Sequence, residues 1–98
     1  MSSTDAYNAE RDAYLHGFAA NVRRLRTSRQ PRISQEMLSE STGLHRTEIG
    51  RIERGIAEPR LTTLVILAEA LGVRLDELVA GLPVPRERRP APWPRGRI

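Results

Sequence analysis

Cysteine and lysine are absent from this chain of 98 residues, and aromatic residues are few. Without cysteine, neither a disulfide framework nor a thiolate metal site can form. The two histidines, His16 and His45, lack the spacing of metal ligands, so we expect no metal site and no cofactor. No apolar run approaches the roughly 20 residues that span a bilayer, and the polar start MSSTDAYNAERDA is unlike a secretory signal. The composition therefore predicts a soluble, cytoplasmic protein.

The sequence also lacks the residue groupings on which enzymes depend. Its glutamates are scattered over expected helix faces, and no nucleophile, base and orienting group occur together. We therefore expect no catalytic residues and no enzymatic activity.

The distribution of charge is more informative than the net charge of +4. All sixteen basic residues are arginines, and nine of them lie in residues 22–60 against five acidic residues. Residues 1–21 and 61–81 each carry net negative charge, whereas residues 82–98 carry five arginines against one glutamate. A compact basic block within a domain is typical of proteins that bind polyanions. Many proteins that bind nothing share this feature, so the charge alone decides little.

The first predicted helix runs from residue 4 or 5 to about residue 28. Its apolar residues recur at spacings of three and four, and these are Leu15, Phe18, Val22 and Leu25. Pro31 ends the segment, because proline breaks a helix interior.

A short second helix is predicted over residues 35–42, with Ser34 as its N-cap. Gly43 can close this helix in the left-handed conformation that glycine adopts at little cost. The third predicted helix spans residues 45–54, and Gly55 ends it.

Two further helices are predicted in LTTLVILAEALG and RLDELVAG, after which residues 82–98 contain five of the seven prolines and no apolar periodicity. We expect an N-terminal extension at 1–14 that is partly helical, a domain at 15–81, and a disordered Pro/Arg-rich tail at 82–98. Five helices without a convincing strand predict an all-α five-helix bundle. The predicted core consists of Phe18, Val22, Leu25, Ile33, Leu38, Leu44, Ile49, Ile52, Leu64, Leu67, Ala68, Leu71, Leu75 and Leu78.

The stretch GLHRTEIGRIERG, residues 43–55, has two different faces when it is drawn as a helix. Ile49 and Ile52 share one face, which can be buried. The opposite face is polar and carries Arg46, Thr47, Gly50, Arg51 and Arg54. In an isolated helix these arginines would simply be solvated, so the rest of the chain must decide what they face.

The run SQEMLSESTGLHRTEIGRIERG, followed by EP, LTTLVILAEALGV and LDEL, resembles the Cro and phage-repressor-like helix-turn-helix family, often called XRE-like. The likeness covers residues 18–80 and depends on an ordered series of motif positions. These include Gln35, Gly43, Glu53-Arg54-Gly55 and Pro59, together with the apolar positions between them. The resemblance implies a lambda-repressor-like bundle and a sequence-specific DNA-binding transcriptional regulator, either a repressor or a controller.

In that family the second motif helix lies in the DNA major groove. The resemblance therefore implies that helix 45–54 reads DNA, with base contacts from Arg46, Thr47, Gly50 and Arg51. It implies phosphate contacts from Gln35, Arg54 and Arg60. Structural roles fall to Gly43, Glu53, Arg26 and Gly55, with Glu53 paired to either Arg26 or Arg29.

The chain departs from the family pattern at several positions. Ser39 stands where alanine is usual, and His45 occupies the cap of the third helix, where serine or threonine is usual. Gly50 lies inside that helix, where glycine costs about 1 kcal/mol relative to alanine. Without a side chain at Gly50, however, the backbone can approach the bases closely.

The partner implied by the resemblance is double-stranded DNA, bound by a homodimer in the cytoplasm at the nucleoid. Leu75, Leu78, Val79 and Leu82 are candidates for the dimer surface. An alternative is a protein-interaction adaptor or an antitoxin that uses the same fold with an acidic or toxin partner. The tail, with its arginines and Trp93, is a candidate site for a protein partner.

Overall fold

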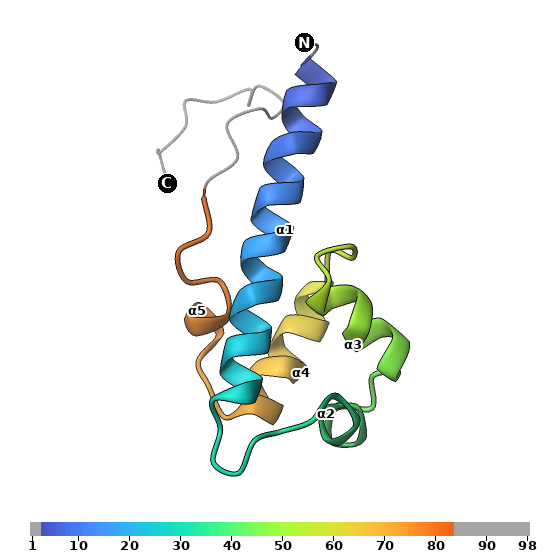
Figure 1. Ribbon diagram of the computed structural model, residues 1–98, viewed down its shortest axis with the longest axis vertical. Helices are drawn as coiled ribbons and strands as arrows, with labels where there is room; N and C mark the ends of the chain where they lie inside the picture. The colour runs from blue at the N-terminus through green and yellow to red at the C-terminus, as the bar shows by residue number, and fades with distance from the viewer. Residues whose placement is uncertain (1–2, 84–98) are drawn as a thin grey trace.

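The computed structural model describes residues 3–83, with side chains from residue 8 onward. Over this range the chain forms five α-helices and no strand: α1 Ser3–Thr27, α2 Gln35–Thr42, α3 Arg46–Glu53, α4 Leu61–Leu71 and α5 Leu75–Leu78 (Figure 1). The all-α prediction is confirmed. Most of the predicted tail, including Trp93, lies outside the described residues. None of the described helices is long and apolar enough to cross a membrane.

Helix α1 is the longest element, and the other helices gather around its C-terminal half (Figure 1). Helices α3 and α5 both pack against α1, while α4 packs against α2 and α5. The N-terminal half of α1 extends beyond the other helices, next to the loop between α3 and α4 (Figure 1). The expected boundary between residues 14 and 15 falls within this one continuous helix.

Ten of the fourteen predicted core residues are buried, three are partly buried and one is exposed. Leu75, predicted inside, is 39% exposed, because α5 is a single turn whose buried residue is Leu78. Leu15 and Ala19 are buried but were not in the predicted set. Leu15 extends the inward face of α1 by one turn, and Ala19 lies on the same face between Leu15 and Val22, since residues three and four apart share a helix face. Among the predicted residues, Ile33, Leu44 and Leu64 are partly buried against the core.

The turn between α2 and α3 is built from short polar side chains and one glycine. Ser34 Oγ accepts a hydrogen bond from the Met37 N–H at 3.0 Å and so caps α2, as predicted. Gly43 closes α2 with φ 77°, in the predicted left-handed conformation. Ser39, the departure from the usual alanine, donates its hydroxyl to the Leu44 carbonyl at 2.6 Å. These bonds satisfy backbone groups that helix ends leave unpaired.

The N-terminus of α3 is capped by His45, whose Nδ1 accepts a hydrogen bond from the Thr47 N–H at 3.1 Å. An imidazole nitrogen can do this only when it carries no proton. The unusual residue at this position therefore still acts as a cap, with nitrogen in place of the usual hydroxyl oxygen.

Gly55, after α3, is required for two separate reasons. Its φ of 71° lies in the left-handed region. In addition, a Cβ at this position would collide with the His16 ring and would lie 3.3 Å from the His16 Cα on α1. By contrast, a Cβ at Gly43 would meet nothing within 4 Å.

The two glycines therefore predict different costs of substitution. We expect Gly43→Ala to lower the free energy of unfolding by about 1–2 kcal/mol, the cost of a left-handed alanine. Gly55→Ala should cost clearly more, because the methyl group must also displace His16. Urea denaturation of the two variants measures both losses, and equal losses would show that the contact with α1 is unimportant.

Candidate nucleic-acid interface

Helix α3 presents its polar residues outward and its apolar residues to the core, as predicted. Ile49 and Ile52 are 1% and 2% exposed, whereas Arg46, Thr47 and Arg51 are all exposed. Four predicted base-contacting residues therefore share the outer side of one helix, because Gly50 lies between them on the same face. Thr47 and Arg51 also line an open hollow together with His45, Glu48 and Ala57.

The outer face near Gly50 is covered by an arginine. A Cβ built on Gly50 would lie 3.4 Å from Nη1 of Arg54, one turn later in the chain. The Arg54 side chain therefore extends back along α3 and does not point away from its end. Any close approach of the Gly50 backbone to DNA requires Arg54 to move aside or to enter the groove with it.

Two of the three predicted phosphate-contacting residues, Gln35 and Arg60, lie at helix N-termini, whereas Arg54 is the C-cap of α3. Arg60 is exposed and is the N-cap of α4, which has no side-chain hydrogen bond to its first N–H groups. Gln35 is the first residue of α2. Free N–H groups and the helix dipole favour an anion at such positions. Gln35 and Arg60 thus lie beside such N–H groups, and no side chain caps those of α4.

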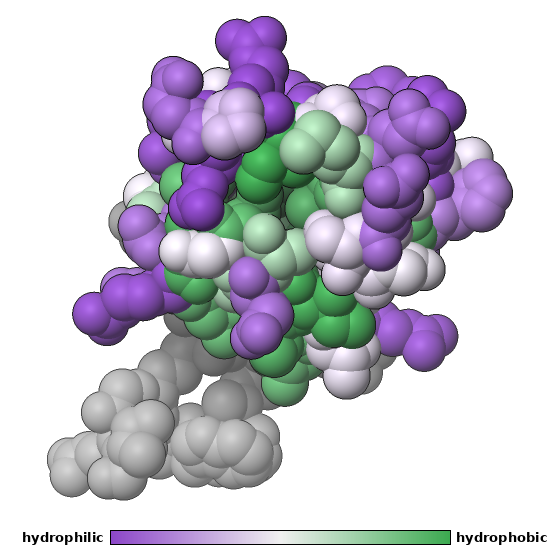
Figure 2. All heavy atoms as spheres, turned by 90° about the horizontal axis from the view of Figure 1, so that it is seen from below, coloured by the Kyte–Doolittle hydropathy of each residue, from purple (hydrophilic) through white to green (hydrophobic). Residues whose placement is uncertain are grey.

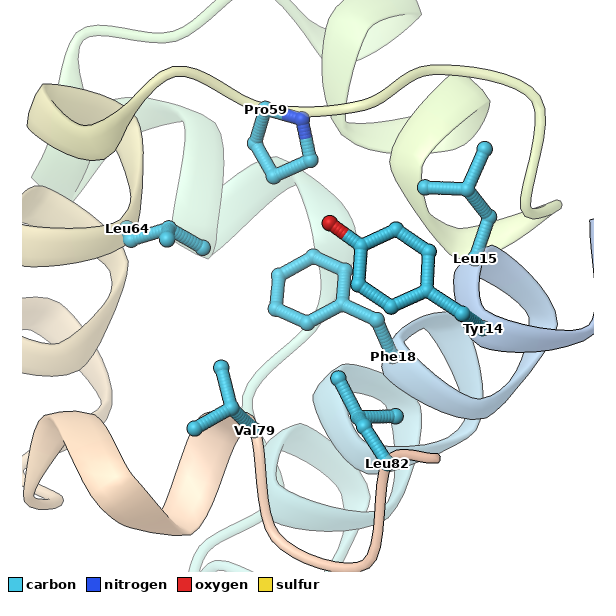
Figure 3. Close-up of a pocket in the computed structure, with 7 residues that line it drawn as sticks. All are labelled: Tyr14, Leu15, Phe18, Pro59, Leu64, Val79 and Leu82. Atoms are coloured by element: carbon cyan, nitrogen blue, oxygen red, sulfur yellow. The ribbon is translucent and has the colours of Figure 1, made fainter. Parts of the chain in front are cut away.

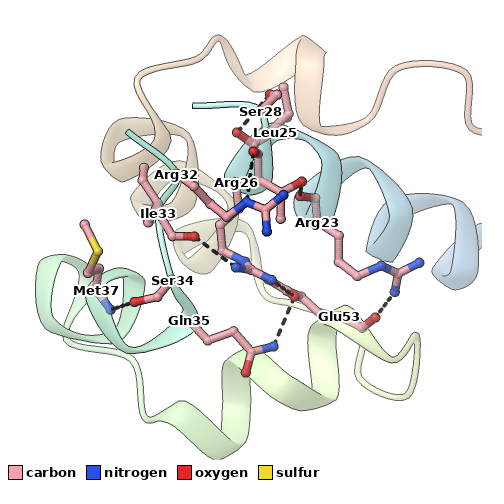
Figure 4. Close-up of polar contacts among 11 residues, drawn as sticks. Arg23, Leu25, Arg26, Ser28, Arg32, Ile33, Ser34, Gln35, Met37 and Glu53 are labelled. Carbon is pink, nitrogen blue, oxygen red and sulfur yellow. Dashed lines mark hydrogen bonds and ion pairs between the residues drawn. The ribbon is translucent and has the colours of Figure 1, made fainter. Parts of the chain in front are cut away.

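A buried ion pair fixes the C-terminal end of α3 (Figure 4). Arg26 donates from Nε to one Glu53 carboxylate oxygen at 2.7 Å and from Nη2 to the other at 2.8 Å. Glu53 is only 3% exposed, so it cannot read a base. Arg26 also donates to the Ile33 carbonyl at 2.9 Å, which ties the loop after α1 to the same pair. These contacts join Arg26 and Glu53, the two residues for which the sequence predicts a structural role.

Arg29, the alternative partner of Glu53, lies elsewhere. A Cβ on Gly72 would be 3.2 Å from the Arg29 guanidinium, which therefore lies at the C-terminal end of α4. A positive charge is favourable there because it faces the negative end of the helix dipole.

Two residues join the Glu53 network in ways that the sequence did not indicate. Gln35 donates from Nε2 to a Glu53 carboxylate oxygen at 3.1 Å, so one of its amide hydrogens is already used. Its other amide hydrogen and its backbone N–H are the groups left for a phosphate. Arg23 donates to the backbone carbonyl of Glu53 (Figure 4). The only signal for Arg23 in the sequence is its position one turn before Arg26 on the same face of α1.

Removing one member of the ion pair should be costly, because it leaves the other charge buried. We expect Arg26→Met to lower the free energy of unfolding by about 3–5 kcal/mol. The double change Arg26→Met, Glu53→Leu should recover most of that loss, since it removes both charges. Urea denaturation tests this, with exposed Arg24→Met on the same helix as control. A loss for Arg26→Met no larger than that of Arg24→Met would contradict the role of the pair.

Comparison with known proteins identifies the family. The family model described as helix-turn-helix matches residues 22–78, more than half of the chain. The chain is 46% identical over 61 residues to control protein C.SmaI of Serratia marcescens, an alignment that covers 62% of this chain and 70% of that protein. It is 39% identical over 62 residues to control protein C.BamHI of Bacillus amyloliquefaciens, covering 63% and 75% of the two chains.

A solved structure agrees in both sequence and fold. The restriction-modification controller protein C.AhdI from Aeromonas hydrophila superimposes with a TM-score of 0.61 at 38% identity, covering 65% of this chain and 94% of that chain. Residues 22–78, which the family model matches, contain α2 and α3, the two helices of the motif. The chain therefore belongs to the helix-turn-helix family, in the XRE-like group of DNA-binding transcriptional regulators, which are not enzymes.

Proposed function

We propose that this protein is a controller of restriction-modification genes that binds a specific operator through α3. The observation that carries the proposal is the division of α3 into a buried apolar face and an exposed face bearing Arg46, Thr47 and Arg51. Three relatives, two control proteins and one restriction-modification controller, support the controller role. The protein would act in the cytoplasm, at the DNA that it regulates.

The base contacts follow from the chemistry of the outer face of α3. Arg46, in the first turn, can donate two hydrogen bonds to O6 and N7 of a guanine. Thr47 can place its methyl group against thymine, and Arg51 lies one turn further on the same face. Arg54 is placed to contact either a base or a phosphate, because its guanidinium lies over Gly50.

The phosphate contacts would flank the reading helix. Gln35 offers the N-terminus of α2, and Arg60 offers a side-chain charge beside the open N-terminus of α4. Such contacts fix the orientation of the protein on the duplex but carry no sequence information. Base-reading and phosphate-binding residues should therefore respond differently to mutation.

We expect Arg46→Ala to cost about 1–3 kcal/mol per half-site on the operator and much less on random DNA. Arg60→Ala should instead weaken both complexes similarly and lower the slope of log affinity against log salt by about one per lost contact. Fluorescence anisotropy titrations of both variants on operator and scrambled duplexes, at several salt concentrations, measure these effects. The operator would first be located by footprinting the DNA upstream of the protein's own gene.

The two outcomes separate the proposal from its alternatives. If Arg46→Ala and the parent have equal specificity ratios, Arg46 does not read bases. If the parent itself binds upstream DNA no better than scrambled DNA, the adaptor or antitoxin alternative becomes the better explanation.

We also propose that the protein binds as a homodimer through α4 and α5. Among the described residues, seven large apolar side chains are exposed, and five of them belong to these helices or to the C-cap of α5: Leu61, Val65, Ile66, Leu75 and Val79. Val65 lies one turn after Leu61, so both are on one side of α4. Apolar surface also occupies much of the face of the molecule seen from below, with hydrophilic side chains around its edge (Figure 2).

This surface differs from the one expected from the sequence. Leu78 is fully buried, and Leu82 lies against Gly17 of α1, where a Cβ would be 2.9 Å from the Leu82 side chain. Leu78 cannot contribute to a dimer without unpacking the monomer, and Leu82 is already partly buried against α1. Leu75 and Val79 remain available, at 39% and 40% exposure.

The dimer can be tested with a charge on α4. Val65 is 53% exposed, so Val65→Asp should leave the monomer folded but place a charge in the subunit interface. Sedimentation should show a shift from dimer to monomer, and the footprint of the parent should be an imperfect palindrome with half-sites about 10 base pairs apart. Met37→Asp, at an exposed apolar residue of α2, is the matched control for oligomeric state. A dimer that survives Val65→Asp would rule out this surface.

Arg86, Arg88, Arg89, Arg95 and Arg97 of the tail lie outside the described residues. We propose that these arginines bind a protein partner. We also propose that they add a salt-dependent contribution to DNA affinity that does not depend on the DNA sequence.

A further inference from the structure

The part of α1 before the family match contacts the loop that joins α3 to α4. The match begins at residue 22, whereas the contacts with residues 55–59 of the loop come from residues 11–18. At one end of the loop, His16 lies directly over Gly55. This segment of α1 is therefore attached to the loop, although the family model does not include it.

At the other end of the loop, α1 holds the carboxylate of Glu58. Tyr14 donates its hydroxyl hydrogen to Glu58 Oε1 at 2.8 Å, and Arg11 Nε lies 3.5 Å from Glu58 Oε2. Arg11 and Tyr14 are three residues apart and so lie on one face of α1. Each of the two carboxylate oxygens thus has its own partner on the same helix, a hydrogen-bond donor at Oε1 and a cation near Oε2.

Apolar packing supports this contact from the inner side. Figure 3 shows the Tyr14 ring beside Phe18 in a small pocket, with the Tyr14 hydroxyl directed toward the side where Pro59 lies. Leu15 and Leu64 also line this pocket. The tyrosine ring therefore packs against the core while its hydroxyl reaches the loop, so the position of the hydroxyl is fixed.

The loop lies between two arginines proposed to face DNA, Arg54 and Arg60. Glu58 is only two residues from Arg60, and without its partners on α1 its charge would oppose a phosphate or pair with Arg60 itself. We propose that Arg11 and Tyr14 are positioning residues, which hold the loop and neutralise Glu58 so that the loop arginines remain available for the DNA backbone. This inference goes one step beyond the proposed function and rests on it.

The proposal is tested by a double-mutant cycle on the full chain. Tyr14→Phe keeps the ring and removes only the hydroxyl, so it should weaken binding to operator and random DNA alike, by about two- to five-fold per half-site. The slope of log affinity against log salt should fall with it. In a Glu58→Gln background the same change should have a clearly smaller effect, because a neutral hydrogen bond to the amide oxygen remains but no charge is left to neutralise. A role in helix stability alone would not depend on the charge of Glu58.

Charge-matched variants complete the design. Arg11→Ala should weaken binding more than Arg74→Ala, which removes an equal charge at the start of α5, on the other side of α1 from α3 (Figure 1). If Arg60→Ala weakens binding and Tyr14→Phe does not, the positioning role is wrong while the proposed phosphate contact stands. If neither change alters binding, both are wrong. Equal effects of Tyr14→Phe with and without the Glu58 charge would also overturn the proposal.

Discussion

The ion pair between Arg26 and Glu53 is the interaction on which the proposed DNA-facing surface depends. Helix α3 has only eight residues, and isolated helices shorter than about 12 residues are marginal in water. Its orientation must therefore come from tertiary contacts. A bidentate pair between a planar guanidinium and a carboxylate fixes distance and angle together, which apolar packing of Ile49 and Ile52 alone does not. The pair is almost fully removed from water, so it contributes more to orientation than to net stability.

The same helix that supplies Arg26 supports both sides of the bundle. Toward α3, Arg23 and Arg26 hold the last residue of the helix through its backbone and its side chain. Toward α5, Asn21 donates to the carbonyls of Leu78 and Ala80, each at 2.9 Å. A helix of one turn can persist because α1 satisfies its C-terminal carbonyl groups and buries Leu78. Helix α3, the proposed reading helix, and the proposed dimer surface are thus both held against α1.

The outer face of α3 is largely independent of the fold that presents it. Arg46, Thr47 and Arg51 are exposed and have no part in the core, so substitutions at these positions cause no loss of packing. Gly50 is different, because it costs helix stability and its surface is covered by Arg54. In the free protein the Arg54 side chain therefore lies over Gly50, and DNA that approached the Gly50 backbone would have to displace it.

The sequence by itself determined the helices, their capping residues and the two faces of α3, because these depend on spacing and on local backbone chemistry. Ser34, Gly43 and the apolar spacing of α1 predicted their elements correctly for that reason. Motif order also led to the family, and with it to Arg26 or Arg29 as the partner of Glu53.

Only the tertiary structure decided between those two arginines, because the choice depends on how α1 and α3 pack and not on distance along the chain. The exposure of Leu75, the hydrogen bond of Gln35 to Glu53 and the contacts of Arg11 and Tyr14 with Glu58 were decided in the same way. Each of these features involves residues on different helices or loops. Such contacts depend on the packing angles of the helices, which many residues determine together and which no local sequence pattern predicts.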